Sequence, residues 1–446
     1  MVKLARAFSH LRPFTALVLG DFLLDTYTSG RVRRISPEAP VPVMEVLKQE
    51  SHPGGAGNVV LNLVSLGATV FAVGRVGSDT EGATLKKLLQ AADTSALFVE
   101  MGYKTPVKNR LIADSQQLIR VDFETIAPLG AGLEETIIAQ LKVLIPRVQV
   151  VAISDYGKGF LTDRLIAAAL QIAKQARIPT IVDPKGFDFA KYKGATVLKP
   201  NLTEGYAAAK LPTTAPLEQV ADALRSLADV LLITRSESGI SIFDAKGRSD
   251  FPVRSKEVKD VTGAGDTVLA MICLGFANGL NIHLAAQLAN IAAGIAIERL
   301  GCVQVSLSDL AQRLLELDSD TKIFDESHTY ALHQVLQGKQ YSLLVLDKGQ
   351  TMTTPLFRTI RQLSSQKELI IYVRDSHPND EFVQLLSSLH EIDYIILQTE
   401  SLKNLCSAIH PHEIFLLEND QPIRLDPAKA LLGALMTPPP KHTSPR

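Results

Sequence analysis

The sequence predicts an α/β protein with a mainly parallel central sheet flanked by helices, followed by a second, smaller α/β unit. Three observations lead to this prediction. Short apolar runs rich in β-branched residues alternate with amphipathic helical patterns, as βαβ units require. Most polar motifs directly follow an apolar run, which is where parallel sheets place their ligands. Near residue 317 a polar stretch interrupts the alternation, which then begins again.

Six short apolar runs define the buried strands of the first unit. They span residues 15–19, 70–73, 150–153, 180–182, 197–198 and 230–233. Residues 134–144 and 163–176 show the apolar periodicity of helices that cover such a sheet. Right-handed βαβ connections between these runs give a largely parallel sheet.

Residues 31–48 (RVRRISPEAPVPVMEVLK) break the alternation with three prolines among alternating apolar residues. Proline removes a ladder donor, so this segment is not a central strand. We predict an edge hairpin, or β flap, that covers a substrate or pairs with another subunit. A plain surface excursion is the alternative.

A second α/β unit begins after a polar, linker-like stretch at residues 318–327. Its apolar runs at 342–346, 369–373, 394–397 and 414–417 predict the strands of a small Rossmann-like domain. We therefore expect a first domain at 1–317, a linker and leading helix at 318–340, a C-terminal domain at 341–436 and a disordered tail at 437–446.

The composition excludes several functional classes. The 446 residues are 46% hydrophobic and 21% charged with a formal net charge of −1, which gives no basic field for nucleic acid or an anionic membrane. Three cysteines without CxxC spacing argue against a cysteine zinc cluster and a disulfide framework. The first residues lack a signal-peptide pattern, and no apolar run reaches the roughly 18 residues of a membrane span. We expect a cytoplasmic protein that binds neither nucleic acid nor membrane.

Residues 260–267 (DVTGAGDT) carry the most chemical information. Gly263 and Gly265 allow a tight turn and a close backbone approach to a ligand, and the apolar run at 268–280 predicts a helix that follows. The free N–H groups of its first turn suit a transferring phosphoryl group, and Asp266 is placed to deprotonate an acceptor hydroxyl. A glycine turn with an N-capping aspartate is the alternative. The motif is neither a Walker loop nor a dinucleotide fingerprint.

Two upstream features suit recognition of a polyol. Gly54 and Gly55 let the chain approach a ligand, and Asn58 offers hydroxyl groups both a donor and an acceptor. Asp21 ends the first apolar run as a short acceptor for a sugar diol, and Asp25 follows one turn later. Alternatively, these carboxylates only cap turns.

Three further motifs follow apolar runs and suit a nucleotide. Asn201 and Glu204 in KPNLTE share one face of a helical turn, where they could contact Mg²⁺-bound phosphates; a capping pair is the alternative. Residues 234–239 (TRSESG) suit the phosphates and ribose. Lys185 in DPKG is either a phosphate partner or an ordinary surface lysine.

In this order, the GGAGN, NLTE and DVTGAGD motifs resemble those of the ribokinase-like (PfkB-type) carbohydrate kinases. RISPEAPVPV, SQQLIRVDFE, SDYGKGF, DPKGFDFAKYKGA and TRSESG are more specifically similar to the heptose 7-phosphate kinase half of bacterial ADP-heptose synthases. The resemblance spans residues 17–317. It implies the ribokinase-like fold and the ATP-dependent phosphorylation of D-glycero-β-D-manno-heptose 7-phosphate at C1, a step towards the lipopolysaccharide inner core. The alternatives are a kinase for another sugar and a scaffold without catalysis.

The resemblance also implies roles for individual residues. Asp266 is the catalytic base, and Gly263, Ala264 and Gly265 form the anion hole. The predicted sugar-binding residues are Asp21, Asp25, Gly54, Gly55 and Asn58. ATP is assigned to Asn201, Leu202, Thr203, Glu204, Ser236 and Gly239, with Mg²⁺ held through water by Asn201 and Glu204.

Further ligands and partners follow from the same resemblance. A potassium ion is expected beside the anion hole at Asp260 and Thr262. The cationic candidates for the substrate phosphate are Arg110, Arg120, Lys158 and Lys185, of which we select Arg120 and Lys185. We also expect a homodimer clasped through the flap at residues 31–48.

The second unit is similar to the nucleotidyltransferase domain that follows such kinases, but it departs from that family at one loop. The family carries an HxGH motif whose histidines contact nucleotide phosphates, whereas residues 347–356 (DKGQTMTTPL) contain no histidine. Met352 and Pro355 stand at the two positions, and neither supplies a cationic donor. His377, His410 and His412 lie on other loops without that spacing. We predict a degenerate transferase domain without adenylyltransferase activity, kept for stability or assembly.

Overall fold

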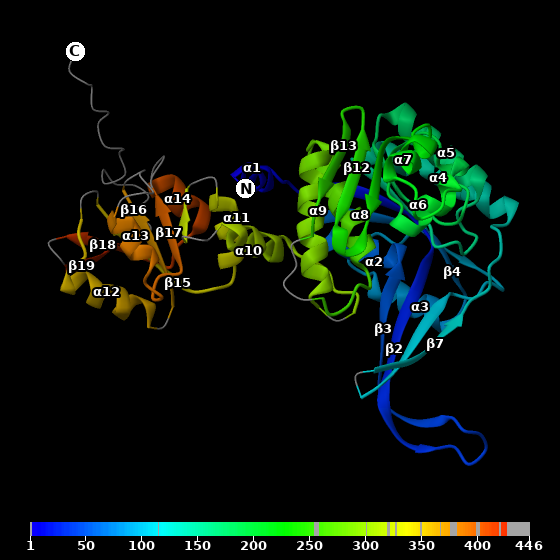
Figure 1. Ribbon diagram of the computed structural model, residues 1–446, viewed down its shortest axis with the longest axis horizontal. Helices are drawn as coiled ribbons and strands as arrows, with labels where there is room; N and C mark the ends of the chain where they lie inside the picture. Colours follow the sequence, from blue (N-terminus) through cyan, green and yellow to red (C-terminus); the bar gives the residue numbers. More distant parts are fainter. Residues whose placement is uncertain are drawn as a thin grey trace. The chain divides into compact units, whose positions relative to one another are not determined.

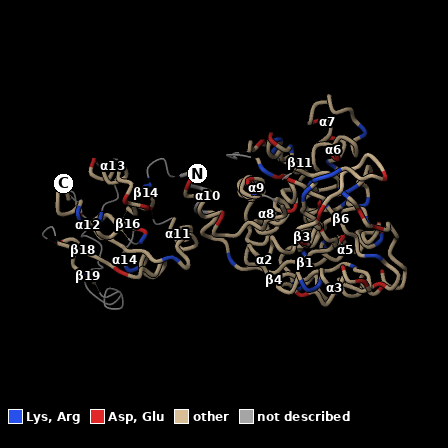
Figure 2. The backbone as a smooth tube through the Cα atoms, turned by 90° about the horizontal axis from the view of Figure 1, so that it is seen from below, with Lys and Arg blue, Asp and Glu red and all other residues tan. Residues whose placement is uncertain are grey.

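The computed structural model in Figure 1 describes residues 2–114, 116–253, 258–299, 301–318, 322–325, 328–347, 350–365, 367–374, 381–397, 402–418 and 421–425. The chain forms two compact units, each described here by itself. One is Leu11–Ser306, and the other combines Met1–His10 with Leu307–Arg446. Figure 2 shows acidic and basic residues interspersed along the backbone, in keeping with the net charge of −1.

The first unit is built on a nine-stranded sheet in the order β13-β12-β11-β10-β9-β8-β1-β4-β5. The strands are β1 (Phe14–Gly20), β4 (Ala68–Gly77), β5 (Leu97–Glu100), β8 (Val150–Ser154), β9 (Thr180–Asp183), β10 (Ala195–Leu198), β11 (Ala228–Thr234), β12 (Ile240–Asp244) and β13 (Gly247–Phe251). Strands from β5 to β11 pair in parallel, and β12 and β13 return antiparallel at one edge. The predicted parallel sheet is confirmed, since each predicted run lies within one of these strands.

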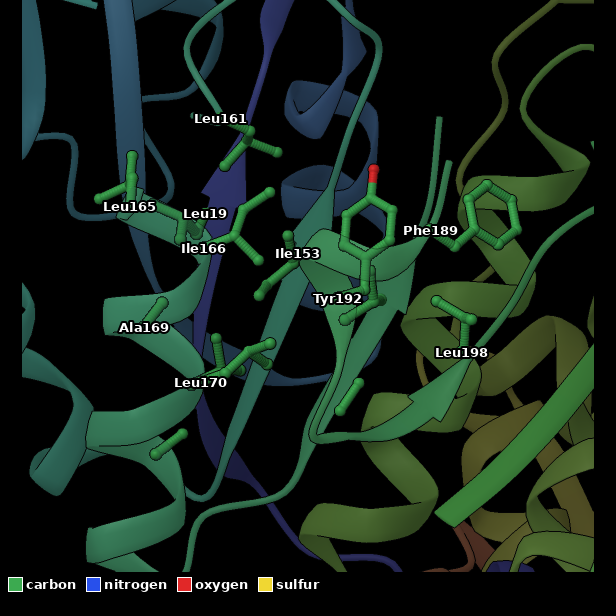
Figure 3. Packing of buried hydrophobic residues seen from close by; sticks show 14 of the residues in the cluster. Leu19, Ile153, Leu161, Leu165, Ile166, Ala169, Leu170, Phe189, Tyr192 and Leu198 are labelled. Carbon is green, nitrogen blue, oxygen red and sulfur yellow. The ribbon is translucent and has the colours of Figure 1, made fainter. Parts of the chain in front are cut away.

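Helices cover both faces of this sheet. They are α2 (Ala56–Ser65), α3 (Thr80–Leu88), α4 (Ala131–Leu144), α5 (Asp163–Ala176), α6 (Leu202–Ala209), α7 (Leu217–Leu224), α8 (Ala264–Ala277) and α9 (Ile282–Ile297), with short 3₁₀ segments at η1 (Ile145–Arg147), η2 (Ala190–Tyr192) and η3 (Ser236–Ser238). On one face, Leu19 and Ile153 pack against Leu165, Ile166 and other apolar residues of α5 (Figure 3). Helices α2 and α8 pack against each other and against β1 and β8.

Helix α5 shows why these segments fold as the sequence predicts. Thr162 caps its first turn by accepting a hydrogen bond from Leu165 N at 3.1 Å. The residues on its buried face recur with helical spacing, so one stripe enters the core. The helix ends at Arg177, which adopts a left-handed conformation with φ 59°.

The segment predicted as a flap belongs to a separate four-stranded sheet in the order β3-β2-β6-β7. Its strands are β2 (Phe22–Ile35), β3 (Pro42–Gly55), β6 (Val107–Ala113) and β7 (Gln116–Phe123). Strands β2 and β3 form the long antiparallel hairpin, which confirms the predicted β flap. Strand β6 pairs in parallel with β2 and so brings residues 107–113 beside Asp25.

The second unit contains a six-stranded sheet in the order β14-β17-β16-β15-β18-β19. Its elements are α1 (Val2–Ser9), α10 (Leu307–Asp318), β14 (Ile323–Phe324), α11 (Thr329–Leu336), β15 (Tyr341–Leu346), α12 (Thr354–Ser364), β16 (Glu368–Val373), α13 (Glu381–Ser387), β17 (Tyr394–Leu397), α14 (Leu402–Ile409), β18 (Glu413–Glu418) and β19 (Gln421–Leu425). All neighbours pair in parallel except β18 and β19, so the small parallel α/β domain is confirmed.

The boundary between the units differs from the expected one at residue 317. The chain passes from one unit to the other at Ser306, and the first helix, α1, belongs with the C-terminal unit. The Phe8 ring of α1 packs at a tilt against the Tyr330 ring of α11 with centroids 5.4 Å apart, and Ser308 of α10 donates to the Gln334 carbonyl at 3.0 Å. An amphipathic pattern reveals that a helix has an apolar face but not which unit covers it. The tail expected at 437–446 lies outside the described residues.

Candidate active site

The motif at residues 260–267 forms the entry to helix α8, which begins at Ala264 rather than at the apolar run that starts at 268. Gly263 is the N-cap residue with φ 80°, and a Cβ there would lie 2.8 Å from Asn58 Nδ2. Glycine is therefore required both by the backbone conformation and by the close approach of α2. The N–H groups of Gly265 and Asp266 lie in the first turn, where a helix offers no preceding carbonyl, so they form a small positive site.

Asp266 projects from this first turn and is held by two neutral donors. Asn58 Nδ2 donates to Oδ2 at 2.8 Å, and the Tyr156 hydroxyl donates to Oδ1 at 2.9 Å. Only 4% of Asp266 is exposed. Burial, opposed by the Asn58 hydrogen bond, raises the pKa of Asp266 to about 7. A carboxylate with this pKa is matched to accepting a proton near neutral pH.

Asp21 lies directly after β1 and faces the same region. Its Oδ2 accepts hydrogen bonds from the main-chain N–H of Tyr156 at 2.9 Å and of Lys158 at 3.0 Å. Its Oδ1 is buried and has no hydrogen-bond partner among the described residues. Burial raises the pKa of Asp21. An unpartnered carboxylate oxygen is what a sugar hydroxyl would satisfy.

The glycine pair at the end of β3 leaves room for these carboxylates. A Cβ at Gly54 would lie 2.1 Å from Asp25 Oδ2, and one at Gly55 would lie 2.6 Å from the Asp21 carbonyl oxygen. Gly55 also has φ 57°, a conformation that favours glycine. The structure therefore brings Asp21, Gly54, Gly55 and Asn58 together beside Asp266.

Asp25 is placed differently from Asp21, because it is already paired within the flap sheet. Its Oδ1 forms an ion pair with Arg110 on the neighbouring strand β6. The Arg110 guanidinium also lies over the Tyr27 ring, 5.3 Å from its centroid. Asp25 therefore orients Arg110 towards this region, and a direct contact with sugar would compete with that pair.

The cationic candidates for a substrate phosphate are distributed over the flap sheet and the cavity. Arg120 lies on β7 opposite Arg110 of the neighbouring strand β6. Its side chain is half exposed and donates to Asp122 at 2.9 and 3.0 Å. Lys158 is buried and pairs with Glu124. Lys185 lies elsewhere, in the cavity wall, where it donates to Glu204 Oε1 at 2.7 Å.

Sequence reasoning missed Lys108. Its Nζ lies 5.1 Å from the centroid of the Tyr156 ring, and burial lowers its pKa. Lys108 and Arg110 are two residues apart on β6, so they share one face of the strand. The two-residue spacing of these cations was the available signal in the sequence. The sequence alone did not show which face of β6 lies towards the site.

A cavity of about 700 Å³ opens beside Asp266. The polar part of its wall consists of Asp183, Lys185, Lys199, Asn201, Glu204 and the Gly263–Gly265 turn. Its apolar lining residues include Ile240, Val253, Val258, Val261, Ala293 and Ile297. A ligand that has both charged and apolar parts fits this lining.

Asn201 and Glu204 form a capping box at the start of α6. Asn201 Oδ1 accepts from Glu204 N at 2.9 Å, and Glu204 Oε2 accepts from Asn201 N at 3.1 Å. The capping pair that the sequence suggested as an alternative to a nucleotide contact is therefore present. Both residues also line the cavity. Leu202 and Thr203 are exposed on the first turn of α6 and do not line it.

Ser236 and Gly239 also line the cavity, on the turn after β11. Gly239 has φ 82°, and a Cβ there would lie 2.0 Å from the Phe251 carbonyl oxygen. Ser236 has φ 48°, so the turn is tightly wound at both positions. The main chain of this turn therefore packs closely against that of Phe251, at the end of β13.

The pair of Lys199 and Asp183 was also missed from the sequence. Lys199 is 2% exposed and its Nζ lies 3.0 Å from Asp183 Oδ2, at the ends of two neighbouring strands. The same Nζ lies 3.7 Å from the position that a Cβ of Gly265 would take, directly beside the first turn of α8. Burial raises the pKa of Asp183. The available signal was a lysine directly after an apolar run, in KPNLTE.

Asp260 and Thr262, the expected potassium ligands, brace the loop before α8. Asp260 Oδ1 accepts from Thr262 N at 2.9 Å and from Thr262 Oγ1 at 2.7 Å, and Oδ2 accepts from Gly301 N at 2.9 Å. Burial alone would raise the pKa of Asp260, but these hydrogen bonds bring it below its usual value. Within the described ranges, no group of three or more His, Cys, Asp and Glu side chains forms a metal site.

Met352 and Pro355 lie between the end of β15 and the first turn of α12. Met352 packs against the core of the second unit, and Pro355 is exposed in the first turn of α12. The His410 ring lies 6.1 Å from the His333 ring, and the His412 ring lies 5.6 Å from the Tyr341 ring. His377 lies outside the described residues.

None of the described helices is both long and apolar enough to cross a bilayer.

Comparison with known proteins identifies similar chains over most of this length. Residues 16–309 match the pfkB family carbohydrate kinase model. A protein of Trichlorobacter lovleyi named bifunctional protein HldE is 44% identical over 325 residues, which are 71% of this chain and 66% of that protein. Bifunctional protein HldE of Geobacter metallireducens is 38% identical over 429 residues, which are 88% of this chain and 85% of that protein.

Two solved structures share the fold of the first unit. Arabidopsis thaliana ribokinase, complexed with ribose and ATP, superposes with a TM-score of 0.55 at 17% identity, covering 68% of this chain and 99% of that one. Phosphofructokinase-2 from Escherichia coli, in complex with potassium, gives a TM-score of 0.56 at 18% identity, covering 69% and 99%.

Proposed function

Because the chain belongs to the pfkB family of carbohydrate kinases, which are ATP-dependent phosphotransferases, we propose that it phosphorylates D-glycero-β-D-manno-heptose 7-phosphate at C1 to the 1,7-bisphosphate. Two features support this substrate: the similarity to the HldE proteins and the motifs of the heptose 7-phosphate kinases. The reaction would serve ADP-heptose and lipopolysaccharide inner-core synthesis.

One observation carries the proposal: the Asp266 carboxylate stands in the first turn of α8, in the cavity wall, beside free main-chain N–H groups. In the proposed reaction the acceptor hydroxyl loses its proton to Asp266 while its oxygen bonds to the γ-phosphorus. The bond from that phosphorus to the β,γ-bridging oxygen breaks, and ADP leaves. The amides of Gly265 and Asp266 stabilise the charge on the migrating phosphoryl group.

The residues present fit ATP and Mg²⁺, the cofactors expected of a pfkB kinase. The apolar residues of the cavity wall suit adenine, and Lys185, Lys199 and the first turn of α8 suit phosphates. Asn201 and Glu204 would hold Mg²⁺ through water, since both residues line the cavity. Mg²⁺ supplies charge neutralisation of the phosphate oxygens. A potassium ion at Asp260 and Thr262 remains part of the proposal, supported by the backbone turn they brace.

The flap sheet supports a substrate that already carries a phosphate. Lys108 and Arg110 lie on one face of β6, near Tyr156 and Asp25, on the sugar side of Asp266. An unphosphorylated sugar has no use for two cations here. We assign the 7-phosphate to Lys108 and Arg110, with Arg120 next to them, and place Lys185 at the ATP phosphates instead.

For the second unit we propose a nucleotidyltransferase-like domain without adenylyltransferase activity. Support comes from the absence of histidine at residues 347–356 and from the packing of the partly buried Met352 against the core. The test is incubation of purified protein with heptose 1-phosphate and ATP. No ADP-heptose is expected by mass spectrometry, and its formation would overturn this part of the proposal.

We further propose a homodimer formed through the flap. Val46 and Leu47 on β3 and Ile119 on β7 are more than half exposed, so the flap sheet offers apolar side chains for contact with a second chain. Sedimentation equilibrium should give twice the mass of the 446-residue chain, and Val46→Asp with Leu47→Asp should give monomers.

The buried free thiols of Cys273, Cys302 and Cys406 support a reducing, cytoplasmic location.

The proposed function is tested by an ADP-release assay against a panel of sugar 7-phosphates, 6-phosphates and unphosphorylated sugars. Heptose 7-phosphate should give the highest kcat/KM, and Asp266→Asn serves as the background control. A preference for an unphosphorylated sugar would favour a different pfkB kinase. No turnover with any acceptor, despite ATP binding, would favour a scaffold.

A further inference from the structure

Tyr156, on the loop after β8, connects the two carboxylates of the candidate site. Its hydroxyl donates to Asp266 Oδ1 at 2.9 Å, and its main-chain N–H donates to Asp21 Oδ2, also at 2.9 Å. Asp21 is contributed by the end of β1, and Asp266 by the first turn of α8. One residue therefore fixes the distance between the base and the carboxylate that faces the sugar.

The ring of Tyr156 is held in place by groups on two further elements. A Cβ at Gly55 would lie 3.3 Å from the ring Cδ2, so the glycine at the end of β3 allows the close packing of the ring. Lys108 Nζ, on β6, lies 5.1 Å from the ring centroid. An ammonium group near an aromatic ring at this distance favours a fixed ring position. The direction of the phenolic hydroxyl is therefore set by the flap sheet.

The charged and titratable groups around Asp266 act in opposite directions. Asp183 from β9 favours the protonated form of Asp266, whereas Lys199 from the loop after β10 favours the ionised form. The Cys302 thiol is nearby and stays uncharged, since burial raises its pKa to about 12. The hydrogen bonds from Asn58 and Tyr156 both favour the ionised carboxylate.

The hydroxyl of Tyr156 is a donor at every working pH. Burial, together with the nearby Asp266, raises the pKa of Tyr156 well above its usual value. It therefore cannot take the proton of the acceptor hydroxyl, and its own proton stays in the hydrogen bond to Oδ1. A buried hydroxyl needs a hydrogen-bond partner, and the partner of this one is the carboxylate that we assign as the base.

We propose that Tyr156 is a positioning residue for phosphoryl transfer, whose hydroxyl keeps the Asp266 carboxylate ionised and oriented while its main chain holds Asp21. This inference rests on the proposed function, because it needs Asp266 to be the base. The proton released by the acceptor hydroxyl goes to Asp266, and Tyr156 is unchanged at the end of the reaction.

The test compares full-length wild type with Tyr156→Phe, which removes the hydroxyl and keeps the ring. We expect kcat at pH 7 to fall about tenfold and the acid limb of the kcat profile to move to higher pH by about one unit, while the Kd for ATP is unchanged. Tyr206→Phe is the matched control, because its hydroxyl donates to the Ala215 carbonyl at 2.7 Å, away from Asp266. It should leave the profile where wild type has it.

A second readout needs no substrate. The carboxyl carbon of Asp266 is titrated by NMR in protein labelled with ¹³C-aspartate, with the resonance assigned from its loss in Asp266→Asn. The midpoint should be higher in Tyr156→Phe than in wild type. Equal midpoints would overturn the positioning role even if the wild type is an active kinase. A shifted midpoint in a protein with no kinase activity would instead reject the proposed function alone.

If Tyr156→Phe does not fold, 4-aminophenylalanine introduced by codon suppression keeps the ring shape and an N–H donor. In this variant the titration midpoint of Asp266 should lie close to the wild-type midpoint, because a donor to Asp266 is retained. It should not show the shift of about one unit that is expected when the donor is lost. A midpoint displaced by a full unit or more despite the retained donor would contradict the proposal.

Discussion

Lys199 Nζ lies 3.0 Å from Asp183 Oδ2, and this buried pair stands directly beside the first turn of α8. The ammonium group therefore adds a positive charge to the amides that we assign to the migrating phosphoryl group. Asp183 compensates that charge while the site is empty. The relationship links two strand ends of the central sheet to the chemistry at Asp266.

Lys199→Met should lower kcat by about 10²-fold, because it removes a preorganised cation from the phosphoryl site. The variant also leaves Asp183 buried without its partner, so it should unfold at a lower temperature. The double variant Lys199→Met with Asp183→Asn should recover most of the thermal stability but not kcat. Steady-state kinetics and thermal unfolding distinguish the two effects, and recovery of kcat in the double variant would contradict the catalytic role.

Asp266→Asn should lower turnover by about 10²–10⁴-fold, since an amide cannot accept the proton of the acceptor hydroxyl. ATP binding should persist, as measured by isothermal titration calorimetry. In wild type, kcat should rise as the pH increases through the Asp266 pKa of about 7, because the base must be ionised. Turnover by Asp266→Asn within threefold of wild type would show that another group is the base.

Asp266 should also affect folding stability in a pH-dependent way. Its pKa is about 7 in the folded protein and near 3.8 when unfolded, so the folded state binds the proton more tightly. The contribution of Asp266 to stability is then fully present below about pH 4 and is lost as the pH rises to about 7. Asp266→Asn removes this dependence. The melting temperature of the variant minus that of wild type should increase between pH 4 and 7 and stay constant above; a difference independent of pH would contradict the raised pKa.

Asn201 is expected to serve both the fold and the nucleotide. Asn201→Ala removes the α6 cap and should lower the free energy of unfolding by about 1 kcal/mol. It should also weaken Mg²⁺–ATP binding. Asn281→Ala is the matched control, because Asn281 caps α9 by accepting from Leu284 N at 3.0 Å. Asn281→Ala should lose a similar amount of stability with unchanged ATP affinity. Equal losses of ATP affinity in both variants would show that Asn201 acts only as a helix cap.

Much of the fold could be predicted because it depends on local pattern. Each predicted strand of the central sheet lies within an observed strand, since short apolar runs rich in β-branched residues favour buried strands. The flap hairpin at β2 and β3 followed from prolines that exclude a central strand. The helix entry at Gly263 followed from glycines, although the helix begins before the apolar run because small residues also form its first turn.

The sequence by itself determined the strands, the glycine turns and the polar residues that follow each strand, because those depend on backbone conformation and neighbouring residues. Only the tertiary structure decided which of these residues meet. Three contacts join segments that are separate in the chain: Tyr156–Asp266, Asp25–Arg110 and Lys199–Asp183. The same is true of helix α1, which belongs with the C-terminal unit. Such contacts depend on the order of strands in a sheet and on the burial of apolar faces, which are properties of the whole fold and not of any local segment.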